Sequence, residues 1–327
     1  MRFYDIFNGD ADGLCALHQL RLADPRAATL ITGVKRDNAL LARVTPEHGD
    51  ELTVLDVSLD TNRKALLGAL HTGARVRYFD HHFAGEIPHH RLLEAHIDTS
   101  AAVCTSLIVD RHLGGRHRAW AIVGAFGDNL RTQAYCAASA LGLKHADVEA
   151  LRELGESLNY NAYGANLADL HFHPAQLYLR MQPFANPLEF CAQAPELDAL
   201  RGASADDLRQ ALALPIENVG DDAVVIFMPE AAWSQRVAGT FANELSRRHA
   251  DRTVAVLVRT GAGYQVSLRA PENGEHAMHL LARQFESGNG RARAAGIQFL
   301  PEPDVARLLA LLRHPFADGA PEPATDA

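Results

Sequence analysis

The sequence lacks the features that mark membrane-spanning, secreted and zinc-binding proteins. No apolar stretch approaches the roughly 20 residues that a membrane-spanning helix requires. No charged leader followed by a long apolar segment opens the chain, so a cytoplasmic location is expected. The four cysteines show no CxxC spacing, which predicts reduced, buried thiols in place of a disulfide framework or a zinc site.

The chain also lacks an excess of basic residues, since its formal net charge is −9 at pH 7. Proteins that hold long nucleic acids use many Lys and Arg contacts, which give a basic stripe or a high isoelectric point. The acidic balance therefore favours short phosphorylated substrates over long duplex DNA and over processive digestion of single strands.

The length and apolar content of the chain predict two domains. A chain of 327 residues exceeds one average core, and 47% of its residues are hydrophobic. We predict a first domain over residues 1–190, a connector over 191–220 and a second domain over 221–315. The remaining residues, 316–327, are rich in Pro, Ala, Asp and Glu and are predicted to be disordered.

Apolar runs of strand length alternate with segments of helical periodicity. In the first domain, strands are predicted at residues 3–7, 27–32, 52–55 and 76–79, and a fifth run, 121–126, fits a strand or the end of a buried helix. Helices are predicted at residues 13–22, 61–70, 99–112 and 146–158. Asp60 or Thr61 would cap the second helix, and Gly73 would close it. The second domain has predicted strands at 223–228, 253–258 and 264–268 and a helix at 234–249.

This alternation with short connections predicts an α/β fold. The first domain would be a doubly wound parallel sheet, followed by a helical connector and a smaller mixed α/β domain.

Acidic and histidine residues lie directly beyond the apolar runs of the first domain. Asp10 and Asp12 follow the first run, Asp56 follows the third, the segment DHH at residues 80–82 follows the fourth, and Asp128 follows the fifth. Ligands of open α/β sheets bind at the carboxyl ends of the strands. Carboxylates combined with imidazole suit Mn²⁺ or Mg²⁺. The pattern therefore predicts a site for hard divalent ions, although an Asp at such a position can also serve only as a helix N-cap.

The order of these motifs resembles the DHH phosphoesterase superfamily. The resemblance rests on DxDG at residues 10–13, the lone Asp56, DHH at residues 80–82 and the Gly-Asp pair that ends at Asp128. Further along, SGNGRARAAG at residues 287–296 is similar to the GGGHxxAAG loop of that superfamily's C-terminal, DHH-associated substrate-binding domain. The strand before it ends in Ser-x-Arg at Arg269. The resemblance covers about residues 1–315.

The resemblance implies a metal-dependent phosphoesterase with two Mn²⁺ ions, or Mg²⁺ in their place. Two ions about 3.5–4 Å apart can clamp the attacking and leaving oxygens of a phosphoryl displacement and activate the attacking water. Asp56 would bridge the ions, and Asp10 and Asp12 would each serve one of them. His81 would bind one ion, and Asp128 would complete the ligands of that ion.

Two further residues of the DHH segment have implied roles close to the reacting group. Asp80 would accept the N–H of an imidazole and so orient it. His82 would point toward the substrate phosphate.

The second domain would bind the substrate phosphate. Gly288 and Gly290 would let backbone N–H groups approach an anion and are expected to open onto a helix N-terminus. Arg269 and Arg291 would add charge-assisted donors. The alternative for this segment is a glycine turn flanked by solvated arginines.

The chain departs from the family pattern at three positions. Many members carry a metal-binding His four residues before the first Asp, where this chain has Ile6. The RecJ-type branch has an acidic residue at the position of Asn8. In this chain we expect Asn8 to contact the substrate or to assist metal binding. Arg291 stands where the loop usually has His, which would keep an anion contact while changing substrate preference.

The leading functional hypothesis is an Mn²⁺-dependent phosphodiesterase or phosphatase acting on small nucleotides. Short oligoribonucleotides, linear or cyclic dinucleotides and 3′-phosphoadenosine 5′-phosphate are the candidate substrates. An exopolyphosphatase or pyrophosphatase is the second hypothesis, and a nucleotide-binding regulatory protein that has lost catalysis is the third. No membrane partner is expected, and a homodimer is compatible with the resemblance.

Overall fold

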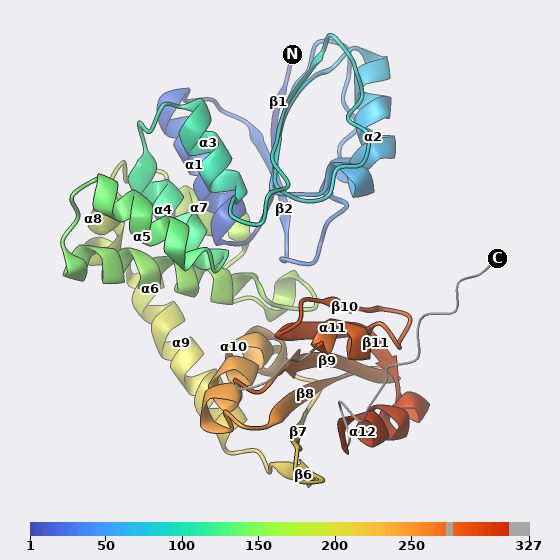
Figure 1. Cartoon of the computed structure of the whole chain (residues 1–327). Coiled ribbons are helices and arrows are strands. Elements are labelled where there is room, and N and C mark those ends of the chain that lie inside the picture. The colour runs from blue at the N-terminus through green and yellow to red at the C-terminus, as the bar shows by residue number, and fades with distance from the viewer. Residues whose placement is uncertain (273–276, 314–327) are drawn as a thin grey trace. The chain divides into compact units, whose positions relative to one another are not determined.

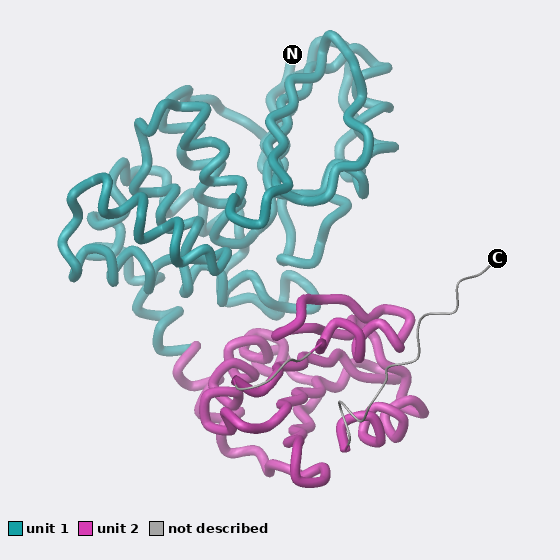
Figure 2. The backbone as a smooth tube through the Cα atoms, in the orientation of Figure 1, with its two compact units in different colours: residues 1–203 teal, residues 204–327 magenta. Residues whose placement is uncertain are grey.

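The computed structural model describes residues 1–272 and 277–313. They belong to two compact units, residues 1–203 and the residues from 204 onward (Figure 2). Helix α9 (Pro195–Leu212) runs through the predicted connector. The finer predicted division at 190 and 220 stays a prediction, and the predicted tail at 316–327 lies outside the described residues.

The first unit is built on a five-stranded parallel sheet with the order β2-β1-β3-β4-β5 (Figure 1). Its strands are β1 (Phe3–Asn8), β2 (Thr29–Gly33), β3 (Glu51–Leu55), β4 (Arg75–Asp80) and β5 (Leu93–Ile97). Four of these strands are the predicted ones. The edge strand β5 was not predicted because its sequence, LEAHI, alternates polar and apolar residues and has no apolar run.

Alternate residues of the strands point to opposite faces of this sheet, and each face has its own core. Phe7, Leu55 and Phe79 pack against the helices on one face. Ile6, Val54 and Tyr78 pack on the other face with α2. Figure 1 shows α1, α3 and α4 on one side of the strands and α2 on the other. The predicted doubly wound α/β architecture is therefore confirmed.

The helices of the first unit cover the sheet and extend beyond it. They are α1 (Ala11–Ala23), α2 (Leu59–Thr72), α3 (Thr105–His112), α4 (Arg118–Gly127), α5 (Arg131–Ala140), α6 (His145–Ala162), α7 (Pro174–Met181) and α8 (Pro187–Gln193), with short 3₁₀ turns at η1 (Leu40–Arg43) and η2 (Leu167–Asp169).

Two of the predicted helix starts were wrong. Ser58, not Asp60 or Thr61, caps α2 by accepting the Thr61 N–H, whereas Gly73 closes it in the left-handed region as predicted.

The other wrong start concerns α3, which begins at Thr105 and not at residue 99. The cause is a tertiary contact. The Asp12 carboxylate accepts the backbone N–H groups of Thr105 and Ser106, at 2.7 and 2.8 Å. A carboxylate at this place satisfies free N–H groups and favours the positive end of the helix dipole.

The second unit has a six-stranded mixed sheet with the order β10-β11-β9-β8-β7-β6. Its strands are β6 (Glu217–Val219), β7 (Ala223–Met228), β8 (Thr253–Thr260), β9 (Gly263–Arg269), β10 (Gly288–Gly290) and β11 (Ala294–Pro301). Helix α10 (Ala232–Arg248) packs on β8 and β9. The core residues of α11 (Met278–Ala282) and α12 (Val305–Arg313), which follows the 3₁₀ turn η3 (Glu302–Asp304), pack with residues of β7, β8 and β9. The predicted smaller mixed α/β domain is confirmed in type.

The four cysteines are free thiols, but they are not all buried. Cys15 and Cys104 are buried, Cys191 is partly buried and Cys136 is exposed on α5. Burial of every thiol was therefore a wrong prediction. Over the two described ranges, none of the helices combines the length and the apolar character that crossing a membrane would take.

Candidate metal centre

The carboxyl ends of three adjacent parallel strands bring the predicted polar residues together. Asn8 ends β1 and leads into Asp10, Asp56 follows β3, and Asp80 ends β4 ahead of the two histidines. Neighbouring parallel strands end at the same edge, so side chains that are far apart in the sequence become neighbours. The fifth apolar run is a helix, α4, and Asp128 is its C-cap residue.

His81 lies between two of the carboxylates. Its Nε2 atom is 3.4 Å from Asp56 Oδ1 and 3.8 Å from Asp128 Oδ2. Two groups of three residues have ligand atoms that lie within 4.8 Å of one another. The first group is Asp12, His81 and Asp128, and the second is Asp56, His81 and His82. A divalent ion needs oxygen and imidazole ligands converging at about this spacing.

Asp12 is fully buried, and both of its carboxylate oxygens accept backbone N–H groups from α3. Ser106 Oγ in turn donates to the Asp12 carbonyl at 2.8 Å. Asp12 thus stabilises the start of a helix and also faces His81 and Asp128. The N-cap interpretation and the ligand interpretation are compatible at this residue, since each carboxylate oxygen has a second lone pair.

Asp10 is the N-cap of α1 and accepts the Gly13 N–H at 3.0 Å. Its other oxygen accepts from Lys35 Nζ at 2.5 Å. Burial alone would raise the pKa of Asp10, but the Lys35 ammonium outweighs burial and lowers this pKa to about 2. Asp10 therefore carries its negative charge even though only 2% of it is exposed.

Sequence reasoning missed Lys35. It lies two residues beyond β2, the one predicted strand of the first sheet whose end carries no recognised motif. Its ammonium is 3.7 Å from Asp128 Oδ1 in addition to the contact with Asp10. The available signal was its place just after a strand end, because β2 ends at the same edge of the sheet as the other strands.

Asp56 is the most constrained of the acidic residues. Its φ angle is +59°, in the left-handed region that non-glycine residues rarely occupy, and it is 1% exposed. Thr105 Oγ1 donates to its Oδ1 at 3.0 Å. Burial, followed by the nearby charges of Asp12, Asp10 and Asp128, raises its pKa well above the ordinary value.

The carboxylates of Asp10, Asp12, Asp56 and Asp128 form an acidic cluster that has more negative than positive charge. Burial and the neighbouring carboxylates also raise the pKa of Asp128, to about 6, against the opposing effect of Lys35. Asp80 Oδ2 is buried and has no hydrogen-bond partner among the described residues. Hard oxygen donors that repel one another in a buried cluster fit a divalent cation, which would neutralise them.

Asp80 orients His82 and not His81. His82 Nδ1 donates to Asp80 Oδ1 at 2.7 Å, and the Asp80 side chain is fully buried. The His82 side chain is 43% exposed. Burial alone would lower the pKa of His82, but the hydrogen bond and charge of Asp80 outweigh it and raise this pKa.

Replacing Asp80 with asparagine is expected to lower the pKa of His82, because the carboxylate that favours the charged imidazole is lost. The pKa is read from the pH titration of the His82 ring protons by NMR, assigned with a His82→Gln variant. Asp60→Asn, which changes an exposed carboxylate paired with Arg63, is the control and should leave the titration unchanged. An equal pKa in Asp80→Asn and the unmodified protein would contradict the contact.

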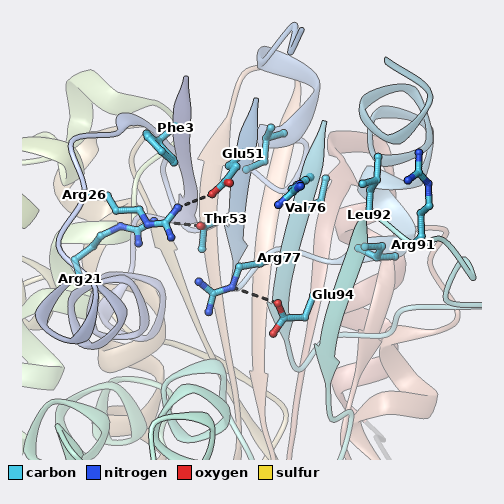
Figure 3. A pocket seen from close by; sticks show the side chains of 13 residues that line it. Phe3, Arg21, Arg26, Glu51, Thr53, Val76, Arg77, Arg91, Leu92 and Glu94 are labelled. Carbon is cyan, nitrogen blue, oxygen red and sulfur yellow. Dashed lines mark hydrogen bonds and ion pairs between the residues drawn. The ribbon is translucent and has the colours of Figure 1, made fainter. Parts of the chain in front are cut away.

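One cavity of the first unit lies away from these residues. It measures about 450 Å³ and is lined by parts of β1, β3, β4 and β5 together with Arg21, Arg26 and Arg91. Figure 3 shows two of its arginines paired with acidic residues, Arg26 with Glu51 and Arg77 with Glu94. None of the predicted site residues lines this cavity.

The predicted phosphate loop of the second unit does not open onto a helix, so that expectation was wrong. Gly288–Gly290 is strand β10, which pairs in antiparallel register with β11. Gly290 has φ +149°, and a Cβ there would lie 2.4 Å from the Ala295 backbone, so the close strand pairing accounts for this glycine. Arg291 is exposed, and Arg269 at the end of β9 donates to Asn243 Oδ1 at 2.7 Å.

No protein-family model and no curated protein matches the sequence. Solved structures do match its fold. An exonuclease RecJ bound to manganese shares 19% identity over 98% of this chain and 91% of its own, with a TM-score of 0.59. The pGpG-specific phosphodiesterase PggH from Vibrio cholerae shares 16% identity over 97% and 100%, with a TM-score of 0.54. An exopolyphosphatase-related protein from Bacteroides fragilis shares 14% identity over 96% and 92%, with a TM-score of 0.51.

These similarities extend over both units of the chain and agree with the motif resemblance. At the level of the fold, the chain is therefore similar to RecJ exonuclease and the pGpG phosphodiesterase, as the resemblance to the DHH phosphoesterase superfamily predicted.

Proposed function

We propose that this chain is a divalent-metal-dependent phosphoesterase that hydrolyses small nucleotides, with Mn²⁺ as the favoured ion. The observation that carries the proposal is the convergence of Asp56, His81 and Asp128, with His81 Nε2 at 3.4 and 3.8 Å from the two carboxylates. The structural neighbours support it, because one is an exonuclease bound to manganese and another is a phosphodiesterase specific for pGpG.

Asp12, Asp56, His81 and Asp128 would hold the ion. A divalent ion bound there supplies a Lewis acid that polarises a phosphoryl oxygen and lowers the pKa of water. His82, fixed by Asp80, would donate a hydrogen bond to a substrate phosphoryl oxygen. The Lys35 ammonium would add a second positive charge at the same edge of the sheet.

The substrate phosphate would be bound by Asn8, Arg269, Arg291, Gly288 and Gly290. Asn8 is held in place, since its amide donates to the Lys35 carbonyl at 3.2 Å and its Oδ1 accepts from the Asp10 N–H. In the second unit, the exposed guanidinium of Arg291 is suited to a phosphate even without a helix N-terminus.

Small substrates are favoured over long nucleic acids. The formal net charge of −9 opposes binding to a polyanion over many phosphates. The pGpG phosphodiesterase is matched over 97% of this chain and 100% of its own, so the two chains have nearly the same extent. We therefore place linear dinucleotides first among the candidate substrates.

We expect Mn²⁺-dependent release of mononucleotides from pGpG or pApA and none in the presence of a chelator. A panel of these dinucleotides, a short oligoribonucleotide, a cyclic dinucleotide, 3′-phosphoadenosine 5′-phosphate and tripolyphosphate separates the alternatives by chromatography of the products. His81→Ala should abolish the turnover, whereas His145→Ala, at an exposed residue of α6, should keep it.

Three other outcomes of this experiment would contradict a part of the proposal. Phosphate release from tripolyphosphate alone would favour the exopolyphosphatase hypothesis. Tight nucleotide binding with no hydrolysis in Mn²⁺ would favour a regulatory protein. Equal turnover in His81→Ala and the unmodified protein would remove His81 from the site.

A further inference from the structure

We propose that the Lys35 ammonium takes the place of a second divalent cation, so that the metal centre binds one ion per chain and not two. This inference rests on the proposed function, since it concerns the same acidic cluster. It revises the expectation of two ions that the motif resemblance implies.

Asp128 connects two parts of the cluster, which also meet directly where Asp10 approaches Asp56. The Oδ2 atom of Asp128 is 3.8 Å from His81 Nε2, on the side where Asp56 also lies. Its Oδ1 atom is 3.7 Å from Lys35 Nζ, on the side where Asp10 lies. One carboxylate thus faces an imidazole with one oxygen and an ammonium with the other.

The part around Asp10 offers few ligands for a metal ion. Both Asp10 oxygens already have donors, the Gly13 N–H and Lys35 Nζ. Among the described residues, no group of His, Cys, Asp and Glu close enough to share an ion includes Asp10. Ile6, four residues before Asp10, is fully buried in the apolar core on the α2 face and provides no ligand atom.

Lys35 is held in place by more than its ion pair. Its backbone N–H donates to the Ala162 carbonyl at 2.9 Å, which fixes the start of the side chain. Its ammonium donates to Asn159 Oδ1 at 3.2 Å and lies 5.7 Å from the centre of the Tyr163 ring. These partners come from α6 and the residue after it, a segment that carries none of the motifs, and they add to the contacts with Asp10 and Asp128.

Charge balance favours the same conclusion. Asp10, Asp12, Asp56 and Asp128 can supply four negative charges, of which Lys35 neutralises one. One divalent ion then leaves the cluster close to neutral, whereas a second would lie within a few ångströms of the ammonium and be repelled by it. Replacing the ammonium by a neutral side chain should make room for that second ion.

The test is the number of Mn²⁺ ions bound per full-length chain, measured by equilibrium dialysis with elemental analysis after removal of metal. We expect one ion for the unmodified protein and two for Lys35→Met, which removes the charge and keeps most of the side-chain volume. Lys35→Arg keeps the charge, and Lys64→Met removes an exposed lysine; both should bind one. Electron paramagnetic resonance should show coupled neighbouring Mn²⁺ ions in Lys35→Met only.

Two ions in the unmodified protein would overturn this inference and leave the proposed function standing. No bound ion in the unmodified protein would overturn both. One ion in a folded Lys35→Met variant, checked by circular dichroism, would show that Lys35 is not what excludes the second ion. If Lys35→Met does not fold, the ion count of the unmodified protein still decides, and Lys35→Gln provides a second neutral variant.

Discussion

Replacing Asp56 with asparagine is expected to abolish Mn²⁺ binding and to lower turnover by roughly 10³-fold or more. The metal contributes charge stabilisation worth several kcal/mol, and about 1.4 kcal/mol corresponds to a factor of ten in rate. Asp56 is buried beside His81, so no mobile side chain can move in and supply the ligand oxygen that the substitution removes. Isothermal titration with Mn²⁺ and steady-state kinetics on the best dinucleotide measure the two losses.

The same substitution should stabilise the metal-free protein at neutral pH. Burial and three nearby carboxylates raise the pKa of Asp56, so this residue opposes folding increasingly as the pH rises above the ordinary pKa that the carboxyl has in the unfolded chain. The amide of asparagine keeps an oxygen for the Thr105 hydroxyl and removes the charge. The gap in unfolding free energy between variant and unmodified protein should narrow as the pH falls, because the native carboxyl then takes up a proton.

Asp60→Asn is the matched control for this experiment, since it neutralises an exposed carboxylate of the same unit. It should leave Mn²⁺ binding, turnover and stability nearly unchanged. Full metal binding in Asp56→Asn would contradict the assignment of Asp56. A loss of stability without metal would contradict the argument from repulsion between buried carboxylates.

Replacing Asp5 with alanine is expected to destabilise the first unit by about 3–5 kcal/mol, the cost of leaving one partner of a buried ion pair alone. Asp5 on β1 and Arg21 on α1 have side chains only 2% and 5% exposed. The guanidinium donates to both Asp5 oxygens, and it also donates to Thr53 Oγ1 at 3.1 Å. Without Asp5, this positive charge would stay buried with one neutral acceptor from β3 and a long contact to the Asp24 carbonyl.

Urea unfolding followed by Trp fluorescence measures this loss. Trp120 is fully buried in the first unit, and a Trp233→Phe background makes it the only Trp of the chain. Glu153→Ala, which breaks the exposed pair with Arg201, should cost at most about 1 kcal/mol. An Asp5→Leu/Arg21→Met double variant should recover most of the stability, because no charge is left unpaired. A double variant as unstable as Asp5→Ala would point to a packing defect instead.

The sequence was sufficient for the parts of the fold that local patterns encode. The apolar runs of β1, β3 and β4 and the helical periodicity of α1 and α2 are visible without tertiary information. The strand β5 was missed because an edge strand is half-exposed and carries no apolar run. The start of α3 was placed too early because Asp12, 93 positions away from Thr105, sets it.

The candidate site divides in the same way. By itself, the sequence determined which acidic and histidine residues follow the strands, because each motif is contiguous and its place after an apolar run is a local property. Only the tertiary structure decided that His82, and not His81, is held by Asp80, that Gly288–Gly290 is a strand, and that Lys35 enters the acidic cluster. The physical reason is that a parallel sheet brings the ends of distant strands to one edge, and the contacts made there depend on register and burial that no single segment encodes.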